Sequence, residues 1–282
     1  MYPGVFAQSK PDFPAVIQAE TGEITTYGQL HERAVQLSNV LRSAGLEPGD
    51  HIALCMENHP RYLEVIWGCH YAGLVYTACS SRLTRAELTY IINDCAAKGF
   101  ITSKYKADQA LEIAGDIPNV SVRLMLSGTV DGYDSYEDTV AAASTQPLDN
   151  MLDGVDMLYS SGTTGMPKGV SRPFPGTPLG TATGLSQLLT VGLFQFNENM
   201  VYLSPAPLYH AAPLRFNMSV HGIGGTTVVM EHFDAENYLK FVEKYKATHT
   251  QVVPTMFIRM LKLDETTRTK YCLLYTSDAA DD

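Results

Sequence analysis

The sequence lacks a hydrophobic segment long enough to cross a bilayer. Its most apolar window, 65–79, spans fifteen residues and contains His70, whereas a transmembrane helix needs about 20 apolar residues. The N-terminus has no basic start followed by an apolar run, so we expect no signal peptide. No CxxC pair or cysteine–histidine cluster is present, and we expect reduced, buried thiols in a cytosolic protein. The cysteines are Cys55, Cys69, Cys79, Cys95 and Cys272.

Acidic residues are missing from one long stretch of an otherwise acidic chain. The net charge is −10, which disfavours nucleic acid as a partner. From 157 to 230, however, the only acid is Glu198, and the same stretch contains Lys168, Arg172 and Arg215. A region without carboxylates suits an anion site, because each nearby carboxylate would oppose the ligand's charge. A buried, uncharged core segment would show the same pattern, and both interpretations can hold.

Strand-like and helix-like segments alternate along the chain. With 282 residues and 45% hydrophobic residues, the chain can bury the core of one large domain or two smaller ones. The alternation predicts an α/β protein with stacked, largely parallel sheets flanked by helices. The strands are predicted at "HIALCM", "LVYTA", "GFITS", "VRLML", "VDMLYS", "MVYLSP", "GTTVVM" and "THTQVV", and the later helices near 60–71, 178–194, 211–222, 234–246 and from about 255.

Turn and cap residues define several boundaries near the N-terminus. Thr21–Gly22 separates two strand-like runs and predicts a hairpin. Apolar residues at helical spacing begin near Thr26, and Gly45 stands where a helix C-cap belongs. Thr84 with Glu87 three residues later forms the pattern of a capping box. The segment 128–154 is rich in Gly, Asp, Ser and Thr, and we interpret it as a surface excursion.

The segment "YSSGTTGMPKGV" at 159–170 contains the residue types of a phosphate-binding loop. It does not fit the G-x-x-x-x-G-K-[ST] pattern, because Pro167 and Gly169 occupy the second glycine and the Ser/Thr positions. Its glycines would still let backbone amides converge on an anion, with hydroxyl donors and Lys168 nearby. Three or four charge-assisted hydrogen bonds of about 1.5–3 kcal/mol each could hold a triphosphate. Composition alone leaves a flexible surface turn equally open.

This loop resembles the signature loop of the adenylate-forming superfamily, which includes acyl-CoA synthetases, aryl-CoA ligases, luciferases and peptide-synthetase adenylation domains. Other segments resemble the same family: "TYGQL…LRSAGLEPGDHIALCMEN", "TRAELTYIINDC…FITS", "PLYHAAPL" at 207–214 and "QVVPTMFIRML". The resemblance runs from about residue 11 to Tyr271, and the segment that starts at "PLYHAAPL" looks most like bacterial fatty-acyl-CoA synthetases. It implies a partial N-terminal AMP-binding domain over 1–271.

The resemblance implies a two-step reaction and assigns roles by position. A carboxylic acid, of fatty or steroid/bile type, would react with ATP to give an acyl-adenylate, and coenzyme A would then displace AMP. Mg²⁺ would assist, with Thr164 near the metal, and His210 and Lys168 are the expected catalytic residues. The expected phosphate-binding residues are Ser160, Ser161, Gly162, Thr163, Thr164, Gly165 and Lys168. The expected acid-binding residues are His210, Phe216, Met218 and His221.

The chain departs from the family pattern at its C-terminus. The family's later motifs, including a magnesium-binding glutamate and a catalytic lysine, are absent from these residues. The final stretch 272–282 resembles read-through of a cloning linker, and we hypothesise that it is not native. We therefore expect a fragment with weak or no activity and a tendency to associate through its exposed edge. Further expectations are small-molecule partners, a cytoplasmic location and no transmembrane segment, while a homodimer stays open.

Two other readings remain open. In one, the acyl group passes to a carrier-protein thiol instead of coenzyme A. In the other, the chain is a non-catalytic remnant that binds a nucleotide or an acyl group.

Overall fold

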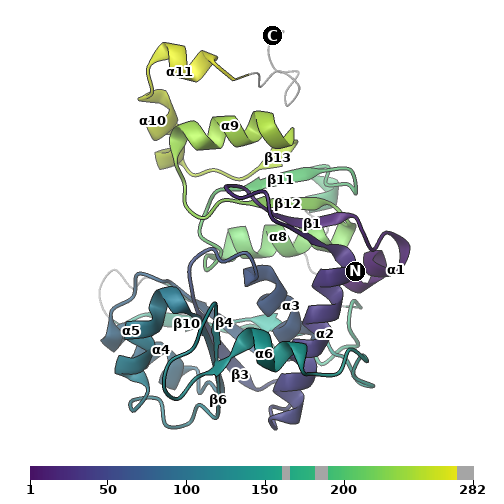
Figure 1. The fold of residues 1–282 in the computed structure, drawn as a ribbon, viewed down its shortest axis with the longest axis vertical. Helices are drawn as coiled ribbons and strands as arrows, with labels where there is room; N and C mark the ends of the chain where they lie inside the picture. The colour runs from purple at the N-terminus through teal and green to yellow at the C-terminus, as the bar shows by residue number, and fades with distance from the viewer. Residues whose placement is uncertain (161–165, 182–189, 272–282) are drawn as a thin grey trace. The chain divides into compact units, whose positions relative to one another are not determined.

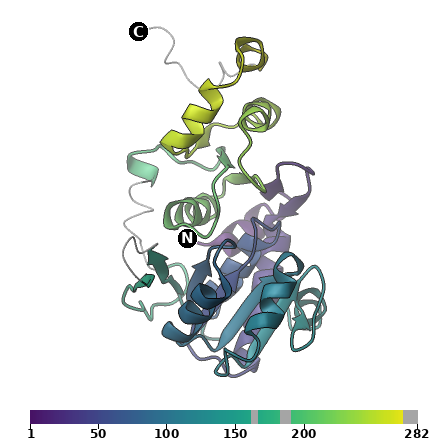
Figure 2. The same ribbon diagram turned by 90° about the vertical axis from the view of Figure 1, so that its left-hand side faces the viewer.

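The computed structural model describes residues 1–160, 166–181 and 190–271. The chain divides into two compact units (Figures 1 and 2). The first contains Met1 and Gln29–Thr183, and the second contains Tyr2–Gly28 and Gly184–Asp282. Each unit is built on a sheet of its own, so the units are described separately.

The first unit contains a parallel sheet whose described strands follow the order β7-β6-β5-β3-β4-β8. Helices flank its strands (Figure 2), as the alternation of segments predicts. The strands are β3 (His51–Cys55), β4 (Val75–Cys79), β5 (Gly99–Ser103), β6 (Val122–Leu126), β7 (Asp134–Ser135) and β8 (Val155–Asp156). The helices are α2 (Tyr27–Ser43), which begins at the boundary between the units, α3 (Tyr62–Tyr71), α4 (Arg85–Asp94), the short 3₁₀ helix η1 (Lys104–Lys106), α5 (Ala107–Ile113) and α6 (Tyr136–Ala141).

The second unit combines the chain's first strands with its later ones. Its described strands follow the order β13-β11-β12-β1-β2, parallel except for the β1–β2 hairpin. They are β1 (Pro14–Gln18), β2 (Ile24–Thr26), β11 (Val201–Ser204), β12 (Thr226–Val229) and β13 (His249–Thr250). The helices are α1 (Pro3–Ser9), α8 (Ala211–Ile223), α9 (Ala235–Tyr245), α10 (Pro254–Leu261) and α11 (Glu265–Thr269).

The predicted turns and caps are confirmed. Gly22 closes the β1–β2 hairpin with φ +78°, and Gly45 follows α2 with φ +88°. Both values lie in the left-handed region that glycine adopts without strain. At α4, the Thr84 hydroxyl accepts from the Glu87 amide while the Glu87 carboxylate accepts from the Thr84 amide, which completes the capping box.

Other predicted elements differ from the structure. "VDMLYS" forms two strands rather than one, because β8 ends at Asp156 and β9 (Leu158–Ser160) pairs with a different partner. "THTQVV" contributes only His249–Thr250 as a strand. Residues 178–181 of the predicted helix 178–194 form a turn, residues 190–192 are helical, and 182–189 lie outside the described residues. The ends of β8 and β13 are set by the strands they pair with, β4 and β11, which are distant in sequence.

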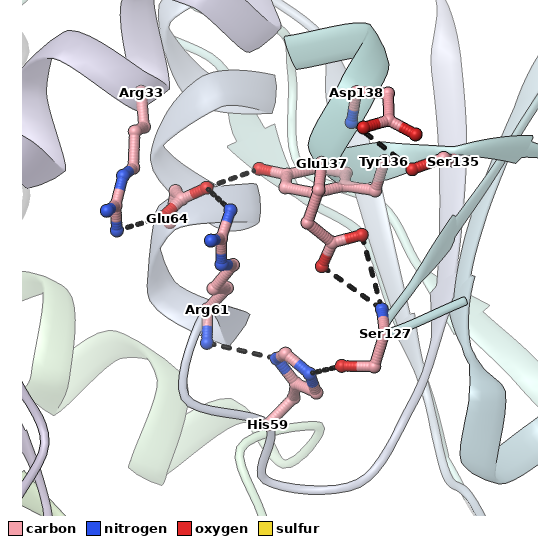
Figure 3. Close-up of polar contacts among 9 residues, drawn as sticks. All are labelled: Arg33, His59, Arg61, Glu64, Ser127, Ser135, Tyr136, Glu137 and Asp138. Carbon is pink, nitrogen blue, oxygen red and sulfur yellow. Dashed lines mark hydrogen bonds and ion pairs between the residues drawn. The ribbon is translucent and has the colours of Figure 1, made fainter. Parts of the chain in front are cut away.

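The segment 128–154 is more than a surface excursion. It contributes edge strand β7 and helix α6, whose Tyr136 is fully buried. Tyr136 donates to Glu64 of α3 across 2.9 Å, and Arg33 and Arg61 approach the same carboxylate at 3.4 and 3.7 Å (Figure 3). Burial raises the pKa of Glu64, and the two arginines oppose that rise. This cluster joins α2, α3 and α6 within the first unit.

Two expectations about composition can also be compared with the structure. Cys55, Cys69, Cys79 and Cys95 are buried free thiols, as predicted, and Cys272 lies outside the described residues. Within the described ranges, no helix is both long enough and apolar enough to span a membrane.

Candidate functional site

Two strands of the first unit flank the glycine-rich segment in the sequence. Strand β9 (Leu158–Ser160) pairs antiparallel with β10 (Lys168–Val170), in a register that places Ser160 opposite Lys168. The Ser160 hydroxyl donates to the Lys168 carbonyl across 3.4 Å. The predicted phosphate-binding residues Ser160 and Lys168 are thus brought together. Ser161, Gly162, Thr163, Thr164 and Gly165 lie outside the described residues.

Gly169 is required by close packing across this hairpin. A Cβ atom added at Gly169 would lie 2.3 Å from Met157 Cε and 3.0 Å from Tyr159 Cζ. Tyr159 is the residue paired with Gly169 in the hairpin register. Its hydroxyl donates to Asp94 Oδ2 at the end of α4 across 2.5 Å. The glycine next to Lys168 therefore makes room for an aromatic ring that connects the hairpin to α4.

Among the residues of β9 and β10, Lys168 alone carries a charge. Its side chain is exposed, and among the described residues no carboxylate lies within ion-pair distance of its ammonium group. Arg172, by contrast, forms an ion pair with the buried Asp156. The acid-poor stretch thus leaves Lys168 available to an anion, whereas the charge of Arg172 is already compensated.

His210 lies beside a pocket in the second unit. It is the N-cap residue of α8 with extended backbone, and its side chain makes no capping hydrogen bond. The pocket has a volume of about 300 Å³. Apart from His210 and Gln251, its lining is alanine, proline, valine and methionine: Ala206, Pro207, Ala212, Pro213, Val253 and Met256. A pocket of this size and character suits the apolar part of a small organic ligand.

The other three predicted acid-binding residues have different surroundings from this pocket lining. Phe216 packs in an aromatic cluster, with ring centroids 5.8 Å from Phe196 and 6.3 Å from Tyr202. His221 is fully buried, and its Nε2 lies 3.2 Å from the Ala15 carbonyl oxygen. Met218 is half-buried on α8. None of the three lines the pocket beside His210, so their contact with an acid stays a prediction.

Gln251, Val253 and Met256 line the pocket but were not expected to be site residues. Gln251 and Val253 lie in the turn between β13 and α10, and Met256 lies in the first turn of α10. The segment "QVVPTM" contained a signal for a helix start. Its apolar residues follow a strand, and its proline stands in the first turn of the next helix, where proline is favoured. The sequence does not show that this turn lies beside the residue that precedes α8.

No cluster of three or more His, Cys, Asp or Glu side chains in the described ranges could hold a metal ion. The predicted metal residue Thr164 lies outside those ranges. The placement of a Mg²⁺ ion therefore stays a prediction.

Solved structures of CoA ligases share this α/β fold. A solved anthranilate CoA ligase in complex with anthranoyl-AMP superposes with TM-score 0.81 and 21% identity, over 97% of this chain and 53% of that chain. The chain belongs to the AMP-binding enzyme family, whose model matches residues 5–277. The predicted family and fold class are both confirmed.

Two curated relatives show the range of named activities. The feruloyl-CoA synthase of an Amycolatopsis species is 32% identical over 84% of this chain and 45% of its own length. The 4-hydroxybutyrate–CoA ligase 2 of Metallosphaera sedula is 26% identical over 83% of this chain and 44% of its own length. The chain thus spans less than half the length of each relative.

Proposed function

We propose that this chain supplies the phosphate-binding hairpin and part of the acid pocket of an ATP-dependent acid–CoA ligase. The carrying observation is the β9–β10 hairpin, where exposed Lys168 faces Ser160 in register and has no carboxylate partner among the described residues. Family membership and relatives named as CoA ligases support the same reaction class.

The proposed reaction has two steps. A carboxylate oxygen attacks the α-phosphorus of ATP, the bond to the β-phosphate oxygen breaks, and pyrophosphate leaves. The thiolate of coenzyme A then attacks the acyl carbon, and AMP leaves. The first step brings two anions together, so a cation fixed near the phosphates lowers the repulsion. Lys168 would hold the β- and γ-phosphates, together with Ser160 and the loop residues Ser161, Gly162, Thr163, Thr164 and Gly165.

Mg²⁺ would neutralise part of the phosphate charge. The hairpin offers it no carboxylate among the described residues, so the ion would arrive on ATP, with Thr164 as the proposed contact in this chain. Magnesium commonly binds through substrate phosphates and a few protein oxygens, which agrees with this arrangement.

The acid would be a hydrophobic one. The pocket beside His210 is lined mostly by apolar side chains, and its volume of about 300 Å³ admits an alkyl chain or ring. We propose a fatty acid or a steroid or bile-type acid, with His210 beside the reacting carboxylate. Phe216, Met218 and His221 of α8 are the further acid-binding residues of this proposal. The relatives' named acids are ferulate and 4-hydroxybutyrate, so chain length stays open.

Two alternatives follow from the same hairpin. In the first, the chain belongs to an adenylation domain that loads the thiol of a carrier protein instead of coenzyme A. A carrier domain encoded downstream in the same reading frame would support this alternative. A non-catalytic nucleotide-binding remnant would bind ATP without pyrophosphate exchange. We further propose that the chain alone is weakly active or inactive, that 272–282 is not native, that the protein is cytoplasmic, and that a homodimer is open to test.

Titration of the chain with Mg·ATP, followed by calorimetry or by NMR, tests the hairpin assignment. We expect measurable, weak binding that falls at least ten-fold in Lys168→Ala, because the phosphate loses its charge partner. Lys240→Ala is a matched control, since Lys240 is exposed on α9 of the other unit. Equal affinities for wild type and Lys168→Ala would refute the assignment.

A further inference from the structure

Tyr159 lies shortly before the glycine-rich segment in the sequence, and its side chain contacts α4. It is the middle residue of β9, between Leu158 and Ser160. Its hydroxyl donates to Asp94 Oδ2 across 2.5 Å, and this bond spans 65 residues of sequence. Burial and the hydrogen bond to Asp94 raise the pKa of the phenol, so the group stays protonated and remains a donor at neutral pH.

The same side chain contacts the opposite strand. Gly169 pairs with Tyr159 in the register, and a Cβ atom there would lie 3.0 Å from Tyr159 Cζ and 3.2 Å from its hydroxyl oxygen. The ring therefore lies against the backbone between Lys168 and Val170. Through this one side chain, both strands of the hairpin are connected to α4.

Asp94 occupies a position that helix electrostatics disfavours. It is the last residue of α4, and the last turn of this helix contains no basic residue. A carboxylate at that end faces the negative end of the helix dipole. An exposed acid at such a position gains nothing from its own helix, whereas it accepts the hydrogen bond from Tyr159. An acid at the unfavourable end of a helix is expected where another contact, here the hydrogen bond from Tyr159, compensates for it.

We propose that Tyr159 and Asp94 are positioning residues, which hold Ser160 and Lys168 in the arrangement that binds the phosphates of the nucleotide. This inference rests on the proposed function, because it assigns a purpose to the contact only if the hairpin binds phosphate. The connection fixes the hairpin before the ligand arrives, so less ordering is required on binding. The role assigned to both side chains is to fix the hairpin, not to contact the ligand.

Three variants separate this role from general stability. Tyr159→Phe keeps the ring over Gly169 and removes only the hydroxyl, and Asp94→Ala removes the acceptor. Tyr90→Phe is the matched control, since Tyr90 lies one turn earlier on α4 and also hydrogen-bonds Asp94, but it is not part of either hairpin strand. Lys168→Ala reports on the proposed function itself.

The measurements are the Kd of Mg·ATP, amide hydrogen exchange across 158–170 and the midpoint of thermal unfolding. We expect Tyr159→Phe and Asp94→Ala each to weaken Mg·ATP binding about ten-fold and to speed exchange of the hairpin amides. The double variant should be no weaker than either single one, because both remove the same bond. The unfolding midpoint should stay within about 2 °C of wild type, and Tyr90→Phe should resemble wild type in every measurement.

The outcomes distinguish the two proposals. If Lys168→Ala weakens binding while Tyr159→Phe binds as wild type does, the positioning role is wrong and the phosphate-binding hairpin stands. If Tyr90→Phe weakens binding as much as Tyr159→Phe, the effect comes from α4 in general and the positioning role is again wrong. If wild type shows no Mg·ATP binding, or Lys168→Ala leaves it unchanged, the proposed function fails and this inference fails with it.

Discussion

Acid should destabilise the second unit through His221. Its ring is fully buried on α8, and Nε2–H donates to the Ala15 carbonyl of β1 across 3.2 Å. Burial lowers the pKa of His221 to about 4 from the usual 6.5. The folded protein therefore keeps this imidazole neutral at a pH where the unfolded chain has already protonated it.

The sign and size of the effect follow from linkage. Between pH 6.5 and about 4 the unfolded state binds one more proton than the folded state at this site, so stability falls as the pH falls. The pKa difference, 6.5 minus about 4, is about 2.5 pH units. At about 1.4 kcal/mol per unit, the loss from this residue approaches about 3 kcal/mol below pH 4. All of its contribution is present above pH 6.5.

The assay is urea unfolding of wild type and His221→Gln at a series of pH values from 7 to 4. Glutamine retains an amide donor for Ala15 and does not titrate. We expect the variant to be less stable at pH 7, because the imidazole packs against Tyr27 and glutamine does not replace that contact. The two ring centroids lie 6.2 Å apart. The difference in unfolding free energy should shift by about 3 kcal/mol in favour of the variant by pH 4.

Parallel stability curves for the two proteins would refute the reasoning. They would mean that His221 is hydrated in solution, as a histidine facing an open acid pocket would be. The same experiment thus bears on the prediction that His221 binds substrate.

Three further predictions concern the first unit. Glu64→Gln should leave the unfolding free energy at pH 7 within about 1 kcal/mol or raise it, because burial raises the pKa of Glu64 and the ionised form costs stability above that pKa; a loss of about 3–5 kcal/mol in chemical denaturation would instead identify an essential buried ion pair. Gly68→Ala should lower stability by about 1–3 kcal/mol, because the new Cβ would lie 2.5 Å from Leu37 Cδ2; Gly115→Ala, with open space around it, is the control, and equal thermal shifts would contradict the packing argument. Thr84→Ala should cost about 1 kcal/mol through loss of the capping box, and an unchanged urea midpoint would show that this cap contributes nothing.

Elements specified by local patterns were predictable from the sequence. The capping box at Thr84 and the glycine after α2 involve residues within a few positions of one another, so a single sequence displays them. The family resemblance of the glycine-rich segment is equally local. The rhythm of strands and helices likewise follows from hydrophobic spacing.

Features that depend on distant partners were not predictable. Tyr136 reaches Glu64 over 72 residues of sequence, and nothing in the composition of 128–154 marks it as buried. His221 meets Ala15 over 206 residues, and which face of α8 is turned to the sheet is set by that pairing. The helix sequence alone shows only that both faces contain apolar residues, so the acid-binding residues on it stay a prediction.

The nucleotide product tests the central claim most directly. ATP, Mg²⁺, coenzyme A and a panel of hydrophobic acids would be incubated with the protein encoded by the complete reading frame around this chain, and the nucleotides separated. The account predicts AMP and pyrophosphate that form only when acid is present, at a rate strongly reduced by Lys168→Ala. Formation of ADP and inorganic phosphate instead would contradict adenylation and show that this hairpin serves a different phosphate chemistry.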